Sequence, residues 1–160
     1  MIPQLWIVAG PNGSGKTTLV QKYFHRFTQQ IPVVNPDTIA AAIKPEDPGT
    51  IVLRAGREAL RQQNSYLNSG TSFLLETTFS GKREIKLLQK AKDLGFKTNL
   101  IFVGLTSPVR NIQRVSRRVL DGGHDVPAKD IERRYGRSMK NLSIGLTLVD
   151  RAFIFDNANK

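Results

Sequence analysis

Residues 10–17 read Gly-Pro-Asn-Gly-Ser-Gly-Lys-Thr and match the phosphate-binding loop pattern G-x-x-x-x-G-K-[ST]. The preceding run from Leu5 to Ala9 is apolar, as in a buried strand, and the run from Thr18 to Phe24 has apolar side chains at helical spacing. In this context glycines let backbone N–H groups turn toward phosphates, and the helix presents its positive N-terminal end to the same anion. The stretch therefore predicts a nucleotide-binding protein.

The loop also predicts which residues contact the nucleotide. Lys16 is expected to reach the β- and γ-phosphates, and Thr17 is expected to ligate Mg²⁺. The other expected nucleotide contacts are Gly10, Pro11, Asn12, Gly13, Ser14, Gly15 and Thr18. An ordinary glycine-rich turn with a coincidental lysine is the alternative, and it is disfavoured because three glycines fall in register with the strand, the lysine and the hydroxyl.

The composition indicates one domain, residues 1–160. The absence of cysteine excludes disulfides and thiolate metal sites, and it fits a reducing compartment. The N-terminus lacks the pattern of a secretory signal, and no segment approaches the roughly 18 apolar residues that suggest a membrane span. We expect a soluble, cytoplasmic protein without a membrane partner.

The net charge of +11 and the isoelectric point near 10.4 indicate attraction to polyanions. Nucleotides, nucleotide sugars, nucleic acid and an acidic protein partner all satisfy this description, as do solvated helix faces. Charge alone does not choose among them.

Strand-like and helix-like runs alternate along the whole chain. The predicted strands are Gln4–Ala9, Val33–Asn35, Ser72–Thr78, Thr98–Leu105 and Ala152–Phe155. The predicted helices follow the loop, span about 51–68 and 83–94, begin at Ser107-Pro108, and run from Pro127 to about Leu148. This alternation predicts an α/β P-loop NTPase fold, a three-layer sandwich with a five-stranded, mostly parallel sheet of order 2-3-1-4-5.

Acidic residues at the carboxyl ends of strands are the leading candidates for chemistry, because ligands of open α/β sheets bind there. Asp37, after the second strand, suits a group that orients an acceptor hydroxyl or takes its proton, although it also suits a helix cap. Glu76 suits a residue that holds Mg²⁺ through water or binds the acceptor, with capping or a salt bridge as the alternative. Asp156 resembles a metal-side acid too, but the predicted order places its strand at the sheet edge, so we favour Glu76.

The stretch from about 107 to 141 is rich in arginine around Gly122-Gly123, which predicts a helical lid over the phosphates. On its first helix, Arg110, Arg114, Arg117 and Arg118 are expected to lie opposite an apolar face. The predicted apolar residues are Val109, Ile112, Val115 and Val119. One or two of the arginines are expected to reach ATP.

The order of motifs along the chain resembles that of the zeta-toxin-like kinases. The motifs that carry the resemblance are the loop from Gly10 to Thr18, Asn35-Pro36-Asp37, Glu76-Thr77-Thr78, Gly122-Gly123-His124-Asp125-Val126-Pro127, Arg133-Arg134-Tyr135 and Arg137-Ser138. Known members of that family use ATP-Mg²⁺ to phosphorylate the sugar of UDP-N-acetylglucosamine, and several are held inactive by an antitoxin.

The resemblance implies a role for individual residues. Lys16 binds the phosphates, Thr17 holds Mg²⁺, and Asp37 activates the sugar hydroxyl. Glu76 and Thr78 bind the nucleotide sugar, and Arg118 stabilises the transferring phosphoryl group. A second lid arginine is implied as well, and Arg133 and Arg134 both fit its register; we favour Arg134.

The resulting hypothesis is an ATP-dependent kinase, a phosphotransferase that acts on the hydroxyl of a small nucleotide-sugar acceptor such as UDP-N-acetylglucosamine, with an acidic antitoxin as a candidate partner. A kinase of a different small acceptor is one alternative. An NTP-dependent nucleic-acid-binding protein is another, disfavoured because the basic residues concentrate near the lid and no recognition helix is evident.

Overall fold

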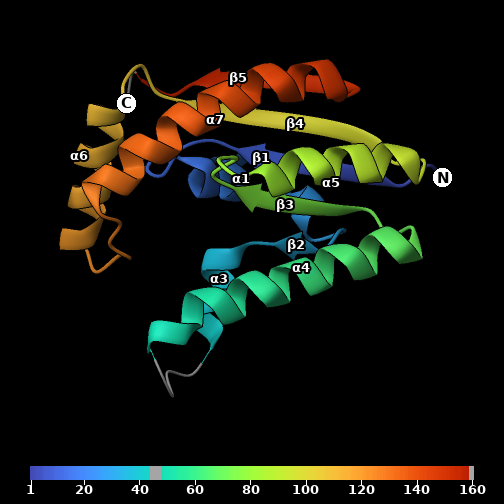
Figure 1. Cartoon of the computed structure of the whole chain (residues 1–160), viewed down its shortest axis with the longest axis horizontal. Coiled ribbons are helices and arrows are strands. Elements are labelled where there is room, and N and C mark those ends of the chain that lie inside the picture. Colours follow the sequence, from blue (N-terminus) through green and yellow to red (C-terminus); the bar gives the residue numbers. More distant parts are fainter. Residues whose placement is uncertain (44–47, 159–160) are drawn as a thin grey trace.

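The computed structural model describes residues 1–43 and 48–158 (Figure 1). Its elements, in chain order, are β1 (Gln4–Ala9), α1 (Lys16–Tyr23), α2 (His25–Thr28), β2 (Val33–Val34), α3 (Pro36–Ala42), the 3₁₀ turn η1 (Pro48–Thr50), α4 (Ile51–Ser69), β3 (Phe73–Thr77), α5 (Lys82–Asp93), β4 (Lys97–Gly104), α6 (Pro108–Leu120), α7 (Ala128–Leu148) and β5 (Arg151–Asp156).

The strands form one five-stranded sheet in the order β2-β3-β1-β4-β5, and every pairing between neighbours is parallel. The predicted order is confirmed, and each predicted strand matches an observed one to within one residue at either end. The long runs of buried apolar residues in β1, β3 and β4 explain this placement, because strands covered on both faces lack a polar side.

Helices cover both faces of the sheet (Figure 1). On one face, Leu5, Phe73 and Leu100 pack with side chains of α4, α5 and α7, including the buried Leu88 and Leu142. On the other face a second cluster joins the strands to α1 and the segment after it. Its members are Val8, Leu74, Ile101 and Val103, with Val20, Trp6, Leu19, Phe24, Phe27 and Ile31 against them. The three layers of the predicted sandwich are therefore present.

Three local details go beyond the sequence patterns or differ from them. The helical segment after the loop ends before Ile31 and is divided: α1 ends at Tyr23 and a short helix follows Phe24, with Phe27 edge-on against Trp6 at a ring-centroid distance of 5.2 Å. The helix α6 begins at Pro108 as predicted, and Ser107 occupies its N-cap position without a side-chain capping hydrogen bond. Val109, predicted on the apolar face of α6, is 56% exposed.

The sheet topology brings the predicted site residues together at the carboxyl ends of the strands. In the registers between strands, Val8 lies beside Glu76 and Ala9 beside Thr77, so the loop after β1 and the end of β3 are neighbours. On the other side β4 continues into the lid helix α6. No helix among the described residues has the length and apolar character needed to cross a bilayer.

Candidate functional site

The phosphate-binding loop joins β1 directly to α1, whose first residue is Lys16. The amide of Ser14 donates to the carbonyl of Pro11 at 3.2 Å, which closes a turn inside the loop. Gly13 has a φ of +74°, and a Cβ at this position would lie 2.8 Å from the carbonyl oxygen of Asn111. A side chain is therefore excluded here by both conformation and space.

Lys16 lies at the mouth of this loop. Its Nζ donates to the carbonyl oxygens of Gly10 at 2.8 Å and Pro11 at 3.2 Å. Desolvation lowers the pKa of Lys16 from 10.5 to about 8, and the positive charge of Arg118 acts in the same direction, whereas the carboxylates of Glu76 and Asp37 act to raise it. An anion that approached this ammonium would favour its charged form.

Thr17 and Glu76 form a hydrogen-bonded pair of oxygen-bearing side chains beside the loop. The Thr17 hydroxyl donates to Glu76 Oε1 at 2.5 Å, and Glu76, which is only 7% exposed, is the last residue but one of β3 and lies beside Val8 of β1. Hydroxyl and carboxylate oxygens suit Mg²⁺, which keeps several waters and shares substrate phosphates. No cluster of three or more acidic or histidine side chains able to hold a metal occurs in residues 1–43 and 48–158, so a cation here would need the phosphates as well. The oxygen pair fits that requirement.

Asp37 lies at the start of α3, on the other side of the site. The helix is capped by Asn35, whose Oδ1 accepts from the amides of Asp37 at 2.9 Å and Thr38 at 3.4 Å. Capping by Asp37, the alternative role considered from the sequence, is therefore wrong. Among the described residues, no hydrogen bond or salt bridge engages its carboxylate, which is exposed to the cavity described next.

A cavity of about 1170 Å³ brings most of the predicted residues together. Its lining includes Asn12, Gly13, Gly15, Lys16, Thr17, Thr18, Asp37, Glu76, Thr78, Arg118 and Arg134. Of the predicted nucleotide contacts, Gly10, Pro11 and Ser14 lie outside this lining, and Ser14 is fully buried. Asp156 reaches the cavity from the edge strand, while one of its carboxylate oxygens accepts from the amide of Ala158 at 2.9 Å.

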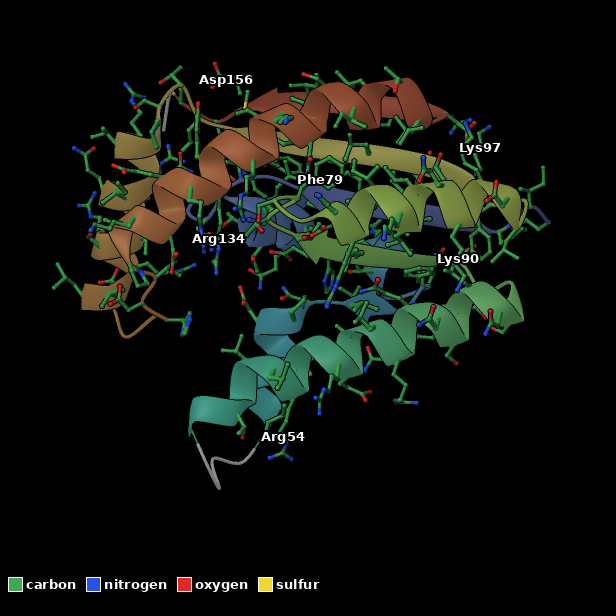
Figure 2. The ribbon with its side chains drawn as sticks, viewed as in Figure 1. Arg54, Phe79, Lys90, Lys97, Arg134 and Asp156 are labelled. Carbon is green, nitrogen blue, oxygen red and sulfur yellow. The ribbon has the colours of Figure 1, made fainter. Side chains whose placement is uncertain are left out.

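The lid arginines occupy different environments. Arg134 of α7 (Figure 2) lines the cavity and donates to Asn12 Oδ1 at 3.3 Å. Arg133 instead pairs at 2.7 Å with Asp130, and both of these side chains are exposed. Arg118 lines the cavity as well and donates to the carbonyl of His124 at 2.9 Å. The structure thus brings Arg134, and not its neighbour, to the phosphate loop.

Asparagine side chains that were not predicted from the sequence bind the loop from outside. Asn111 of α6, fully buried, donates to the carbonyl of Asn12 at 2.6 Å. Asn157, directly after β5, donates to the carbonyl of Ser14 at 2.9 Å. The position of Asn157 at the carboxyl end of a strand is a signal that a reading of the sequence can use, whereas Asn111 lies within a helix and has no distinguishing pattern.

A third unpredicted residue, Ser80, lies on the same side of the cavity as Thr78. Their hydroxyl oxygens are 2.9 Å apart, and both residues line the cavity. Asp37 lines the same cavity, which therefore presents hydroxyl groups and a carboxylate. Such groups can bind and orient a hydroxyl-bearing molecule.

Comparisons with known proteins agree with this architecture. A candidate kinase from Chloroflexus aurantiacus J-10-fl is similar with a TM-score of 0.66 at 19% identity, over 99% of this chain and 90% of that one. A chain of the PezAT chromosomal toxin-antitoxin system of Streptococcus pneumoniae gives a TM-score of 0.72 at 16% identity, over 97% of this chain and 69% of that one. A complex of AvrRxo1-ORF1 and -ORF2 with ATP gives 0.72 at 18% identity, over 98% of this chain and 55% of that one. These likenesses establish a P-loop kinase-like fold.

Two sequence matches identify the family. An uncharacterised protein of Haemophilus influenzae Rd is 32% identical over 139 residues, which cover 82% of this chain and 97% of that protein. The model of the family described as "AAA domain" matches residues 5–138, from β1 through the phosphate loop and the lid into α7. Because that match spans most of the chain and includes the loop around which the cavity is built, the protein belongs to the AAA domain family.

Proposed function

We propose that this protein is an ATP-dependent kinase of the zeta-toxin type, which transfers the γ-phosphoryl group of ATP-Mg²⁺ to a hydroxyl of a nucleotide sugar such as UDP-N-acetylglucosamine. The observation that carries the proposal is the composition of one cavity. Its lining combines phosphate-binding groups, Lys16 and the lid arginines, with a carboxylate and hydroxyls suited to an acceptor.

The donor side of the cavity suits a triphosphate. The loop amides and the N-terminus of α1 favour phosphate oxygens, and Lys16, whose Nζ donates to the loop carbonyls of Gly10 and Pro11, would donate instead to the β- and γ-phosphates. Thr17 would hold Mg²⁺, which supplies charge neutralisation at the phosphates when it is bound. Arg118 and Arg134 would stabilise the charge on the transferring group.

On the acceptor side, Asp37 is the candidate general base. The acceptor oxygen attacks the γ-phosphorus, its proton passes to the Asp37 carboxylate, and the bond from the γ-phosphorus to the bridging oxygen breaks to release ADP. Glu76 and Thr78 would bind the acceptor. The volume of about 1170 Å³ supports the presence of two ligands, since it exceeds the roughly 300–1,000 Å³ of an ordinary ligand pocket.

A protein partner forms a separate part of the proposal. The chain carries a net charge of +11, and structures similar to it come from a toxin-antitoxin system and from a two-protein complex. An acidic antitoxin that covers the cavity is the partner we propose. Its co-purification with the protein from the native host, with loss of ATP binding in the complex, is the expected result.

The central experiment is phosphoryl transfer from ATP-Mg²⁺ by the purified protein to a panel of hydroxyl acceptors that includes UDP-N-acetylglucosamine, measured by mass spectrometry. Lys16→Ala and Asp37→Ala serve as paired variants. We expect a singly phosphorylated UDP-sugar with the wild-type protein and none with either variant, while Asp37→Ala retains ATP binding because Asp37 lies on the acceptor side.

Two other outcomes redirect the proposal. Phosphorylation of a different panel member would retain the kinase and replace its substrate. ATP binding without any phosphorylated acceptor would reject the acceptor class, and a steep salt dependence of DNA or RNA binding would then favour the nucleic-acid alternative that the net charge of +11 permits.

A further inference from the structure

The loop between β3 and α5, residues 77–81, has an unusual backbone conformation. Phe79 has a φ of +57°, and it is the one non-glycine residue among those described with a positive φ. A bulky L-residue is disfavoured in this conformation, which persists only where surrounding contacts impose it.

The contacts that impose it come largely from α7. Nδ2 of Asn141 donates to the carbonyl oxygens of both Phe79 and Gly81, each at 2.9 Å. The fully buried Phe79 ring packs against the same helix, where a Cβ added to Gly145 would lie 3.0 Å from its Cζ atom. A single side chain and a close helix contact therefore define the course of the loop.

The base of the loop is bound independently. The Thr77 hydroxyl donates to Glu84 Oε1 at 2.7 Å and accepts from the amide of Phe79 at 3.1 Å. The Thr77 hydrogen bonds do not involve Asn141. Loss of the Asn141 side chain would therefore release residues 79–81 of the loop while Thr77 stays attached to α5. The effect of changing Asn141 should therefore be local.

The backbone conformation of this loop directs the side chains of consecutive residues to different surroundings, the core and the cavity. Phe79 enters the core, whereas Thr78 and Ser80 on either side of it line the cavity with their hydroxyls 2.9 Å apart. Figure 2 shows Phe79 beneath α7, the helix that also carries Arg134. The helix α7 thus contacts two loops: the phosphate-binding loop, through the hydrogen bond from Arg134 to Asn12, and the loop of residues 77–81, through Asn141.

We propose that Asn141 is a positioning residue for the acceptor: by binding the carbonyls of Phe79 and Gly81 it presents the paired hydroxyls of Thr78 and Ser80 to a hydroxyl-rich substrate beside Asp37. This inference rests on the proposed kinase function. It assigns to α7 a part in substrate recognition, in addition to the contact with the phosphate loop.

The test compares Asn141→Asp with Asn68→Asp. The first variant keeps the size of the side chain and removes its N–H donors, and the second makes the same change at an exposed position on α4, far from the loop. With the acceptor found in the panel, we expect Asn141→Asp to raise the KM for that acceptor about tenfold or more and to change the KM for ATP less than about twofold. Asn68→Asp should change neither constant by more than about twofold.

Amide hydrogen exchange of the same proteins reports the loop directly. Faster exchange in residues 77–81 of Asn141→Asp, with unchanged exchange in residues 10–18, is expected. Unchanged exchange in 77–81, an unchanged acceptor KM, or an equal rise in both KM values would overturn the proposal. If Asn141→Asp folds poorly, Asn141→Ala replaces it under the same criteria. A wild-type protein that phosphorylates no acceptor would reject the proposed function separately, and the exchange result would still decide whether Asn141 orders the loop.

Discussion

Arg133 and Arg134 are adjacent in sequence, yet only Arg134 lines the cavity. Arg133 forms an exposed pair with Asp130, which is worth little because solvent screens it. In the proposed kinase Arg134 stabilises the transferring group, so we expect Arg134→Ala to lower kcat by about 100-fold or more, and Arg133→Ala to lower it less than about threefold. Steady-state kinetics of the two variants make this comparison, and equal losses would contradict the assignment.

At the level of a single helix, two glycines of α7 differ in what surrounds them. A Cβ at Gly136 would have no heavy atom within 4 Å, whereas a Cβ at Gly145 would meet the Phe79 ring and Leu100. Gly136→Ala should raise the free energy of unfolding by about 0.5–1 kcal/mol, because alanine favours the helix. Gly145→Ala should lower it by about 1–3 kcal/mol through overpacking. Urea denaturation of both variants tests the pair. Stabilisation by Gly145→Ala would contradict the prediction and show that the Phe79 ring can shift to accommodate the added methyl group.

The entry into β5 depends on a carboxylate. Asp150 Oδ2 accepts from the amide of Thr98 at 2.7 Å and from its hydroxyl at 2.9 Å, which links the start of β5 to β4. The backbone hydrogen bond is the main reason that the pKa of Asp150 lies below its ordinary 3.8, with smaller contributions from the Thr98 hydroxyl, Lys92 and Lys97.

A lowered carboxyl pKa means that the folded state favours the ionised form. The resulting stability is fully present above the ordinary pKa and is lost as pH falls through the lower folded value. We expect Asp150→Asn to be less stable than the wild type at pH 7 by no more than about 0.5 kcal/mol, because solvent screens this exposed carboxylate and asparagine keeps an acceptor oxygen, and we expect the difference to shrink below pH of about 4. Denaturation series at several pH values check this, and a constant difference down to pH of about 2 would contradict it.

For the whole molecule, the cavity is lined by residues of β3, β4, β5, α1, α3, α6 and α7, so a ligand bound there connects elements from most of the chain. ATP-Mg²⁺ at 100 times its Kd should stabilise the fold by about 2.7 kcal/mol, which corresponds to a rise in Tm of roughly 5–11 °C for a chain of this size. Thermal denaturation with and without nucleotide measures the shift. Lys16→Ala should lose most of it, and an equal shift in that variant would place the nucleotide elsewhere.

The fold follows from local signals in the sequence. The sheet and its strand order are predicted by the loop pattern and by the alternation of apolar runs with helical ones. Glycines mark the helix ends: Gly70, for example, has a φ of +65° and caps the C-terminus of α4. The presence of Lys16, Thr17, Asp37 and Glu76 near one another follows as well, because the carboxyl ends of parallel strands meet at one edge of the sheet.

Contacts between distant segments required the tertiary structure. The hydrogen bonds of Asn111 to Asn12, of Asn157 to Ser14 and of Asn141 to the loop at Phe79 join residues separated by 99, 143 and 62 positions. Helical spacing alone leaves adjacent residues such as Arg133 and Arg134 equivalent. The sequence by itself thus determined the strand order and the residues at the strand ends, since these depend on local pattern and sheet geometry. Only the tertiary structure decided which lid and loop side chains meet, because that depends on how α6 and α7 pack across the end of the sheet.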